Sequence, residues 1–368
     1  MSDAPAPVED VLPGDAPPVD ANEPGKAFAK YKRLVPWAVG LSVATLVALS
    51  LYTQSRGGGH VLTQLRRVDP QALVAALLLH LLMQMAWGLR IRTLGRGLGA
   101  HVSFAKAWSF VVSGLFAAAV TPGRVGGEPW RIAMLVRNGA SGPAASRTIL
   151  ADRAVDMLFF LTLSIIAVTL VPRYFGDVGN VRVLGLVAII GLGLMVVVLS
   201  LALMRPRPIS RILAACVGVP DRVRKRPAVD RAPQIQAFFH EVTAGIKTLL
   251  RRRPLLLLAS AALSCVLWSC ELSILWVVLH GFGFDPPYGA TYLAGVLIVM
   301  VASVPALPGG TGVAEVAALA LLTPLAPGLS PAFLVAWRGM TYYVDLTLGG
   351  IVAGIVVKRP SVRSAPRA

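Results

Sequence analysis

The sequence is poor in charged residues. Only 14% of its 368 residues are Asp, Glu, Lys or Arg, whereas a soluble domain averages about 25%. The stretches 34–53 and 288–306 have no charge at all, and 55% of the chain is hydrophobic. Uncharged apolar runs of about 18 residues or more are typical of membrane spans. This shortage of charge therefore excludes an ordinary soluble protein.

Cysteine is also scarce, and the familiar catalytic motifs are missing. Cys216, Cys265 and Cys270 show no CxxC or metal-ligand spacing, and no HExxH, P-loop or GxSxG sequence occurs. We therefore predict no metal, no cofactor and no catalytic residue. The five histidines are scattered, and His80, which lies inside an apolar run, is interpreted as a packed or pore-lining residue, although a functional role stays open.

The charge that is present is mostly positive. The formal net charge is +17, which in a soluble protein would suggest nucleic acid as a partner. Here the basic residues lie between and beside the apolar runs, where they orient spans and contact anionic lipid headgroups. No nucleic-acid partner is predicted.

The apolar runs predict an all-α polytopic membrane protein with about eight transmembrane helices. The predicted spans are 34–53, 71–90, 103–120, 154–172, 181–204, 254–280, 288–306 and 331–357, and a shorter apolar piece covers 312–327. Residues 1–25 form a Pro- and Ala-rich acidic segment that cannot bury a core, so a disordered tail is expected there. The membrane domain, 26–357, divides into a first half (26–204) and a second half (254–357), followed by a basic tail (358–368).

The basic residues predict the orientation of the chain. The segment 205–253, which joins the halves, has twelve Lys or Arg and three acids, so it is placed in the cytoplasm together with both chain ends. The piece 312–327 must then run outward, yet it reaches only about 24 Å across a core of about 30 Å. It is predicted to be a half-helix or a tilted, broken span. In the first half, 122–140 either crosses back or forms a re-entrant hairpin, and both alternatives remain open.

Two Pro-Gly-x-x-Gly motifs stand at similar places in the two halves. PGRVGGE (122–128) and PGGTGVAE (308–315) both follow an apolar run and both reach a glutamate. This pattern predicts an inverted repeat with broken helices, although Pro-Gly is also common at ordinary helix ends. Such breaks free N–H groups that favour an anion. The residues predicted to break the helices are Pro122, Gly123, Gly126, Gly127, Pro308, Gly309, Gly310 and Gly312.

Ten charged residues lie within or against the spans. Each would cost roughly 2.5–3.5 kcal/mol if it stood alone at the bilayer centre, so most must be paired or hydrated. Arg338, Tyr342 and Asp345 recur at helical spacing and form one stripe. Any one pair could be a structural salt bridge, but the whole set is better explained by a polar cavity. The charged residues are Arg124, Glu128, Arg131, Asp152, Arg153, Asp156, Glu271, Glu315, Arg338 and Asp345.

These motifs resemble the lysylphosphatidylglycerol synthase membrane-region family of flippase-like integral membrane proteins. The resemblance covers about residues 30–357 and rests on PGRVGGEPWR, the Asp152-Arg153-x-x-Asp156 step, LPGGTGVAE and Arg338. An extra glycine (Gly126-Gly127), Asp152 in place of glutamate and Trp337 in place of tyrosine depart from the family pattern. The full synthases have a large soluble catalytic domain. The longest soluble stretch here, 205–253, is too small for one, so the aminoacyl transfer activity is not carried over.

The resemblance implies lipid translocation, and the leading hypothesis is a lipid flippase or transporter of the bacterial inner membrane. Four arginines would bind phosphate, and the acids would balance them or bind a cationic headgroup or a proton. The expected partners are membrane lipids: an anionic or aminoacylated phospholipid, a glycolipid or a hopanoid. Two alternatives stay open: a membrane enzyme acting on a lipid-linked substrate, and a scaffolding subunit that docks an envelope-biosynthesis partner or a second copy. The predicted headgroup-binding residues are Arg124, Glu128, Arg131, Asp152, Arg153, Asp156, Glu271, Glu315, Arg338, Tyr342 and Asp345.

Overall fold

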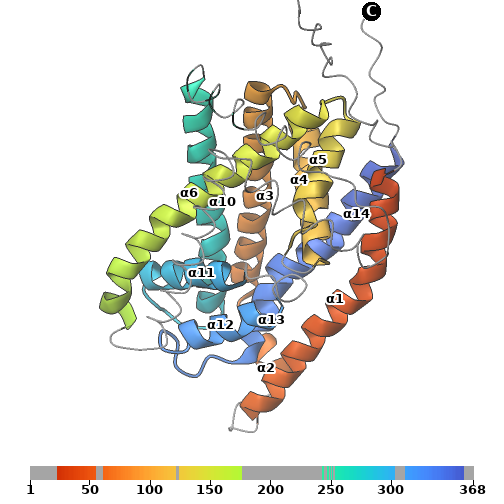
Figure 1. The fold of residues 1–368 in the computed structure, drawn as a ribbon. Coiled ribbons are helices and arrows are strands. Elements are labelled where there is room, and N and C mark those ends of the chain that lie inside the picture. Colours follow the sequence, from red (N-terminus) through yellow and green to blue (C-terminus); the bar gives the residue numbers. More distant parts are fainter. Residues whose placement is uncertain are drawn as a thin grey trace, which may run out of the picture.

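A computed structural model describes residues 23–54, 61–121, 124–175, 253–302 and 311–359, with the single residues 243, 247, 249 and 251. All regular structure in this part of the chain is helical, as predicted (Figure 1). The helices are α1 (Glu23–Gln54), α2 (Val61–Leu65), α3 (Pro70–Leu98), α4 (Phe104–Ala119), α5 (Gly127–Arg137), α6 (Gly142–Phe175), α10 (Pro254–Gly281), α11 (Tyr288–Ala302), α12 (Val313–Leu322), α13 (Pro331–Arg338), a π-helical turn η1 (Gly339–Tyr343) and α14 (Val344–Lys358).

Local sequence fixes the ends of α3. The Asp69 carboxylate accepts a hydrogen bond from the N–H of Gln71 at 2.9 Å, so it caps the helix. Pro70 occupies the first turn, where its missing N–H removes no helical hydrogen bond. The helix ends at Gly99, whose φ of 87° is left-handed. Glycine adopts that conformation without strain, so the chain can turn there.

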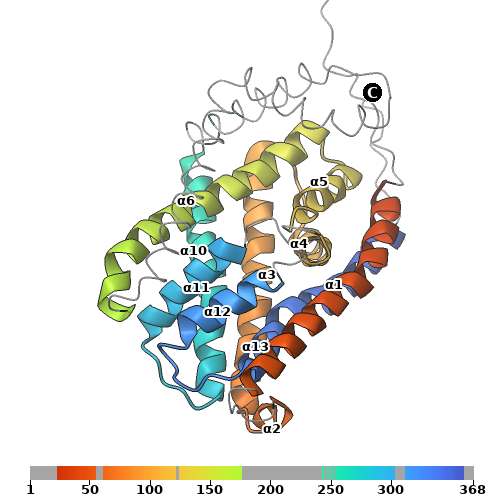
Figure 2. The same cartoon turned by 60° about the horizontal axis from the view of Figure 1, so that its bottom comes forward.

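Helices α3 and α10 form an antiparallel pair at the centre of the molecule (Figure 1). At one end, the N–H of Asp69 donates to the carbonyl of Gly281 at 3.0 Å. At the other end, Leu94 and Leu98 of α3 pack with Leu249 and Leu256. The start of each helix therefore lies beside the end of the other. Helices α1 and α6 lie on opposite sides of this pair (Figures 1 and 2).

Helix α3 has an apolar outer face and a polar inner face. The exposed apolar side chains recur every three or four residues, at Val74, Leu78, Leu82, Met85 and Leu89. The inner face of the same helix buries His80, Gln84 and Arg90. This arrangement suits a lipid environment, in which ionisable side chains face the interior of the protein.

Helices α4 and α5 form a re-entrant hairpin. They contain 16 and 11 residues, so at 1.5 Å per residue they are about 24 and about 16 Å long, and neither crosses a core of about 30 Å. The chain returns to the side from which α4 started, because Gly99 lies beside Ala144 at the start of α6. Of the two alternatives for 122–140, the structure therefore shows the hairpin.

Helices α11 and α12 form a second hairpin at the opposite end of the central pair. They contain 15 and 10 residues, which again is too short for a span. The chain also returns here, because the ring of Phe282, just after α10, contacts the ring of Phe333 in α13 with centroids 6.2 Å apart. Helix α12 is thus the half-helix predicted within 312–327.

The two hairpins complete an inverted repeat. The order α3, α4, α5 has helix lengths of 29, 16 and 11 residues, and the order α10, α11, α12 has 28, 15 and 10. Helix α4 packs on α14 of the second half, and α11 packs on α6 of the first. Since α3 and α10 are antiparallel, the halves have opposite direction. The predicted inverted repeat is confirmed for the described helices.

The structure corrects the number of full-length spans. The predicted spans 103–120 and 288–306 are arms of the hairpins and do not cross a bilayer. Among the described residues, three helices are long and apolar enough to span a membrane: α3, α10 and the continuous Pro331–Lys358. Helices α1 and α6 are longer still, at 32 and 34 residues.

Several flanking predictions lie outside the described residues. These are the span 181–204, most of the segment 205–253, the tail after residue 359 and the tail before residue 23. The predicted disordered tail is one turn too long, because α1 already begins at Glu23. The two ends of the membrane domain lie together, since Gly25 is beside the side chain of Val357.

Candidate functional site

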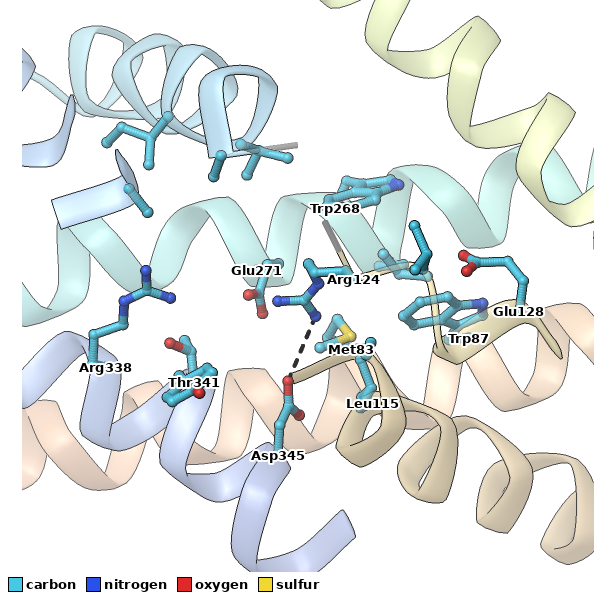
Figure 3. A pocket seen from close by; sticks show the side chains of 18 of the residues that line it. Met83, Trp87, Leu115, Arg124, Glu128, Trp268, Glu271, Arg338, Thr341 and Asp345 are labelled. Atoms are coloured by element: carbon cyan, nitrogen blue, oxygen red, sulfur yellow. Dashed lines mark ion pairs between the residues drawn. The ribbon is translucent and has the colours of Figure 1, made fainter. Parts of the chain in front are cut away.

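A cavity of about 300 Å³ lies between the two hairpins and the central pair (Figure 3). Four arginines and three carboxylates line it, together with Tyr342, Thr341 and several aromatic rings. Eight of the eleven predicted headgroup-binding residues are brought together in its walls: Arg124, Glu128, Arg131, Arg153, Glu271, Arg338, Tyr342 and Asp345. The polar compartment predicted between the hairpins is therefore present in the structure.

The turn of the first hairpin places Arg124 in the cavity. Arg124 has a left-handed φ of 59°, which is uncommon for a residue with a side chain. Its Nη2 lies 3.8 Å from Oδ2 of Asp345, and its side chain is 40% exposed (Figure 3). Gly126 must be glycine because a Cβ there would lie 2.7 Å from the carbonyl oxygen of Ala117. Pro122 and Gly123 lie outside the described residues.

The second break differs from the sequence prediction. Gly312 has a φ of 85°, as a helix break requires. Its N–H, expected to be free for an anion, donates instead to Oε2 of Glu315 at 2.7 Å. Oε1 of the same carboxylate accepts from Nε of Arg338 at 2.8 Å. Glu315 is fully buried and does not line the cavity. Its carboxylate therefore takes the place that a bound anion would have at the start of α12. Pro308, Gly309 and Gly310 lie outside the described residues.

At the first break, the N–H of Gly126 also has an internal partner. The N–H of Gly126 donates to the hydroxyl of Thr121 at 2.9 Å, and Thr121 in turn donates to the carbonyl of Ala117 at 2.8 Å. The expected use of these helix starts as anion sites is therefore wrong for the N–H groups of Gly126 and Gly312. Side chains provide the donors in the cavity.

Trp87 organises the cations at one end of the cavity. The guanidinium of Arg131 lies 4.6 Å from the centre of the indole ring, and that of Arg153 lies 5.3 Å from it. A cation over an aromatic face is stabilised by the ring quadrupole. Glu128 joins the two arginines, since its Oε1 is 3.3 Å from Nη2 of Arg131 and 2.8 Å from Nη2 of Arg153. The two cations therefore share one carboxylate, and Arg153 also lies 3.5 Å from Oδ2 of Asp156.

Asp152 and Asp156 have a structural role that the sequence did not reveal. Both are buried and bind Arg90, with Nε 2.7 Å from Asp152 Oδ1 and Nη2 3.1 Å from Asp156 Oδ2. The hydroxyl of Ser264 accepts from Arg90 Nη1 at 2.6 Å. Neither aspartate lines the cavity. Their assignment to headgroup binding is thus not supported by their position, and they act behind the cavity wall.

His80 connects the two halves of the protein. Its Nδ1 lies 3.1 Å from Oε2 of Glu271 on α10, and its Nε2 lies 3.1 Å from Oδ1 of Asp345 on α14. The amide of Gln84 approaches the same Oδ1 at 3.4 Å. The sequence predicted both acids as site residues and His80 as a packed or pore-lining residue, with a functional role left open. Its place inside an apolar run was the signal, because an ionisable group within a span is a functional candidate.

Several guanidinium groups are buried but incompletely paired. Arg131 is 1% exposed, and its Nε and Nη1 have no hydrogen-bond partner among the described residues. Arg338 is 5% exposed, and its Nη2 also has no hydrogen-bond partner among the described residues. Both residues line the cavity. Buried donors normally have partners, so these groups suit an anion or water inside the cavity.

Within the described chain, no group of three His, Cys, Asp or Glu has a geometry that could hold a metal ion.

Comparison with known proteins agrees with this architecture. Residues 37–349 match the family described as the lysylphosphatidylglycerol synthase TM region. A UPF0104 membrane protein of Archaeoglobus fulgidus is 29% identical over 316 residues, which are 84% of this chain and 93% of the relative. A UPF0104 membrane protein of Methanothermobacter thermautotrophicus is 24% identical, covering 84% of this chain and 92% of the relative. The match spans both hairpins and every wall of the cavity, so the chain belongs to the family of lysylphosphatidylglycerol synthase transmembrane regions.

Proposed function

We propose that this multi-pass membrane protein moves a lipid with a phosphate-bearing headgroup across the bilayer. The observation that carries the proposal is the pair of buried arginines, Arg131 and Arg338, which line one cavity. Nε and Nη1 of Arg131 and Nη2 of Arg338 lack partners in the described chain. Guanidinium forks bind phosphate through charge-assisted hydrogen bonds. Each of these arginines has one carboxylate partner. The protein therefore does not need a bound lipid in order to fold.

The size of the cavity fits a polar headgroup and is too small for a whole phospholipid. A volume of about 300 Å³ corresponds to roughly ten water molecules at about 30 Å³ each. A phosphate with a small polar substituent fills such a space. The acyl chains would stay in the surrounding lipid, against the apolar outer faces of the spans. Aminoacylated phospholipids, anionic phospholipids and phosphate-bearing glycolipids belong to this class.

The acids of the cavity would serve the rest of the headgroup. Glu271 has 24% of its side chain exposed and Glu128 has 32%, so both are accessible from the cavity. An ammonium group on an aminoacylated headgroup would pair with them while the phosphate binds the arginines. A purely apolar hopanoid has no group that could bind the unpartnered N–H groups of Arg131 and Arg338, and we therefore place it outside the proposed substrates.

We further propose that both ends of the membrane domain face the cytoplasm. Basic residues gather at the end of the molecule where α1 begins and α14 ends, and basic flanks favour the cytoplasmic side. They include Lys26, Lys30, Lys32, Arg33, Arg96, Arg253, Lys358 and Arg359. The compared relatives are archaeal, so the bacterial inner membrane stays a prediction. A protein partner or a second copy is not needed for the cavity, which one chain encloses.

Vesicles containing the purified protein test this function. A fluorescent phosphatidylglycerol is placed in both leaflets, and its movement is followed by quenching from outside. Arg124→Asn should slow the exchange about tenfold or more, because a charge-assisted contact worth about 1.5–3 kcal/mol is lost. Asparagine tolerates the left-handed backbone, so the turn is kept.

Two controls make the result specific. Arg124→Lys keeps the charge and should retain more exchange than Arg124→Asn, whereas Arg66→Ala changes an exposed arginine outside the cavity and should leave the rate unchanged. Unaltered exchange in Arg124→Asn would refute the role of this arginine. Mass spectrometry of the recovered lipid separates transport from an enzyme, because a transporter leaves the mass of its substrate unchanged.

A further inference from the structure

His80, Glu271 and Asp345 form a cluster that transport of an anion does not by itself require. The imidazole is 1% exposed and lies between two carboxylates at 3.1 Å on either side. The three residues come from α3, α10 and α14, so the cluster ties the two halves of the inverted repeat together. We refer to these three residues as the His80 triad.

The geometry of the triad defines how many protons it holds. A neutral imidazole has one N–H donor, and an ionised carboxylate has none. Both ring nitrogens face a carboxylate oxygen, so two protons are needed to make two hydrogen bonds. They can sit on the histidine alone, or one on the histidine and one on a carboxyl group. In either case the triad has a net charge of −1. Removing one proton would leave the lone pair of a ring nitrogen facing the lone pair of a carboxylate oxygen.

The surrounding charges support this proton count. The polar interior of the described chain contains five arginines and six carboxylates: Arg90, Arg124, Arg131, Arg153 and Arg338, with Glu128, Asp152, Asp156, Glu271, Glu315 and Asp345. One additional proton on the triad makes the set neutral. Uncompensated charge is costly inside a membrane protein, so the arrangement favours the state with two protons.

Arg124 links the triad to the headgroup. Its Nη2 is 3.8 Å from Asp345 Oδ2, and this cation compensates the negative charge of the triad. A phosphate that draws Arg124 away leaves that charge uncompensated, and a further proton on Glu271 or Asp345 then restores neutrality. Glu271 is the entry point for this proton from solvent, because its side chain is 24% exposed.

The other groups around the triad are engaged elsewhere or uncharged. From α13 and η1, Arg338 pairs with Glu315 and Tyr342 donates to the Ala119 carbonyl at 3.3 Å. From α6, Arg153 pairs with Asp156 and with Glu128, and Asp156 also pairs with Arg90. From α5, Glu128 holds Arg131. Helix α4 has a single ionisable residue, Lys106, in its first turn, and α3 adds the uncharged Gln84.

We infer that the His80 triad is a proton-binding site whose occupancy is coupled through Arg124 to an anionic headgroup in the cavity. Binding of the headgroup takes up a proton from solvent, and the proton rests on a carboxyl group of the triad. Coupling between two ligands is reciprocal, so protonation of the triad strengthens headgroup binding. This inference rests on the proposed function, and it identifies protons as the ion that can drive the movement.

Calorimetry on the purified full-length protein tests the coupling directly. Dihexanoyl phosphatidylglycerol is titrated in two buffers of different ionisation enthalpy, which gives the number of protons taken up for each probe molecule bound. The wild-type protein should take up a proton, approaching about one per probe, and the affinity should fall by up to about tenfold per pH unit as the pH rises. His80→Gln should bind the probe with less proton uptake than the wild type and with a weaker pH dependence, because the two carboxylates lose the imidazole that joins them.

Matched variants separate the triad from general effects. His280→Gln changes a histidine that pairs with Asp285 outside the cavity, and it should keep the wild-type uptake. Glu271→Gln alters the exposed member of the triad and should also reduce the uptake, which covers the case that His80→Gln does not fold. Probe binding without proton uptake in the wild type, or wild-type uptake in both triad variants, overturns the inference and leaves the proposed function standing. No binding of the probe at any pH overturns both.

Discussion

Arg90 is completely buried, and its guanidinium is divided between two aspartates of α6 and a serine of α10. Trp87, one turn earlier on α3, donates to Asp152 at 3.0 Å. The ring of Trp87 also lies under Arg131. The buried Arg90–Asp152 pair therefore supports the cavity wall through Trp87. At the scale of single residues, the protein therefore has two kinds of charge: those that hold helices together and those that face the cavity.

Removing Arg90 should destabilise the protein strongly. Arg90→Met leaves buried Asp152 without its cation and Asp156 with Arg153 alone, 3.5 Å away, and breaking a buried pair costs about 3–5 kcal/mol. The free energy of unfolding, measured by titration with sodium dodecyl sulfate, should fall by about this amount. The exposed Arg96 on the same helix is the control, and Arg96→Met should change stability by less than about 0.5 kcal/mol.

A compensating variant identifies the cause. Adding Asp152→Asn and Asp156→Asn to Arg90→Met removes the uncompensated charges and should restore more than half of the lost stability. If the triple variant is as unstable as Arg90→Met, the loss comes from packing and the electrostatic account of this site is wrong.

At the scale of secondary structure elements, close backbone contacts hold the first hairpin in place. Helix α4 lies against α3, where a Cβ at Gly88 would be 2.8 Å from the Cα of Trp108. It also lies against α14, where a Cβ at Gly349 would be 2.7 Å from the carbonyl oxygen of Val112. These approaches are possible only without a side chain. Since α4 ends at the break that presents Arg124, they also fix the position of that arginine.

Gly349→Ala should loosen this contact. The added methyl group meets backbone that cannot move independently, and overpacking of this kind costs about 1–3 kcal/mol. Thermal unfolding in detergent should show a lower transition temperature, and the exchange of lipid should slow with it. Gly354→Ala on the same helix is the matched control, because its Cβ would lie 3.7 Å from Phe28, and its transition temperature should be unchanged or higher. Equal behaviour of the two variants would contradict the close packing of α4 and α14.

At the scale of the whole molecule, the inverted repeat gives two hairpins that enter from opposite ends and meet at one cavity. The break of the first hairpin places Arg124 in the cavity. The break of the second hairpin provides Glu315, which pairs with the cavity residue Arg338. The cavity therefore lies at the interface of the two repeats, which is where transporters built from inverted repeats bind their substrates. The His80 triad lies where the halves join, so a change in its protonation acts on both.

Labelling of single cysteines tests this topology. In a background without native cysteines, His101→Cys, Ser141→Cys and Lys358→Cys should react with an impermeant maleimide from one side of the membrane. Arg66→Cys, Asp285→Cys and Thr323→Cys should react from the other side, because re-entrant hairpins return the chain to its starting face. The pair His101 and Ser141 is decisive for the first hairpin, and Asp285 and Thr323 for the second. Labelling of either pair from opposite sides would show a complete crossing.

Much of the architecture followed from the order of residues. Uncharged runs predicted the helices, and the two Pro-Gly motifs predicted the breaks, because both properties are local. The stripe of Arg338, Tyr342 and Asp345 was also found from helical spacing, and all three residues line the cavity. The segments of α4 and α11 were wrongly predicted as spans, since a half-length apolar helix and a short span have the same composition.

The sequence by itself determined that this chain is a helical membrane protein, and it predicted two inverted halves with a helix break in each, because hydrophobic length and glycine or proline act within a few residues. That both breaks lie in hairpins came from the structure. Only the tertiary structure decided which charges pair and which face the cavity. His80 meets Asp345 from 265 residues away, and Trp87 meets Asp152 from 65 residues away. Such partners are set by the packing of helices that lie far apart in the sequence, and that packing is a property of the whole fold.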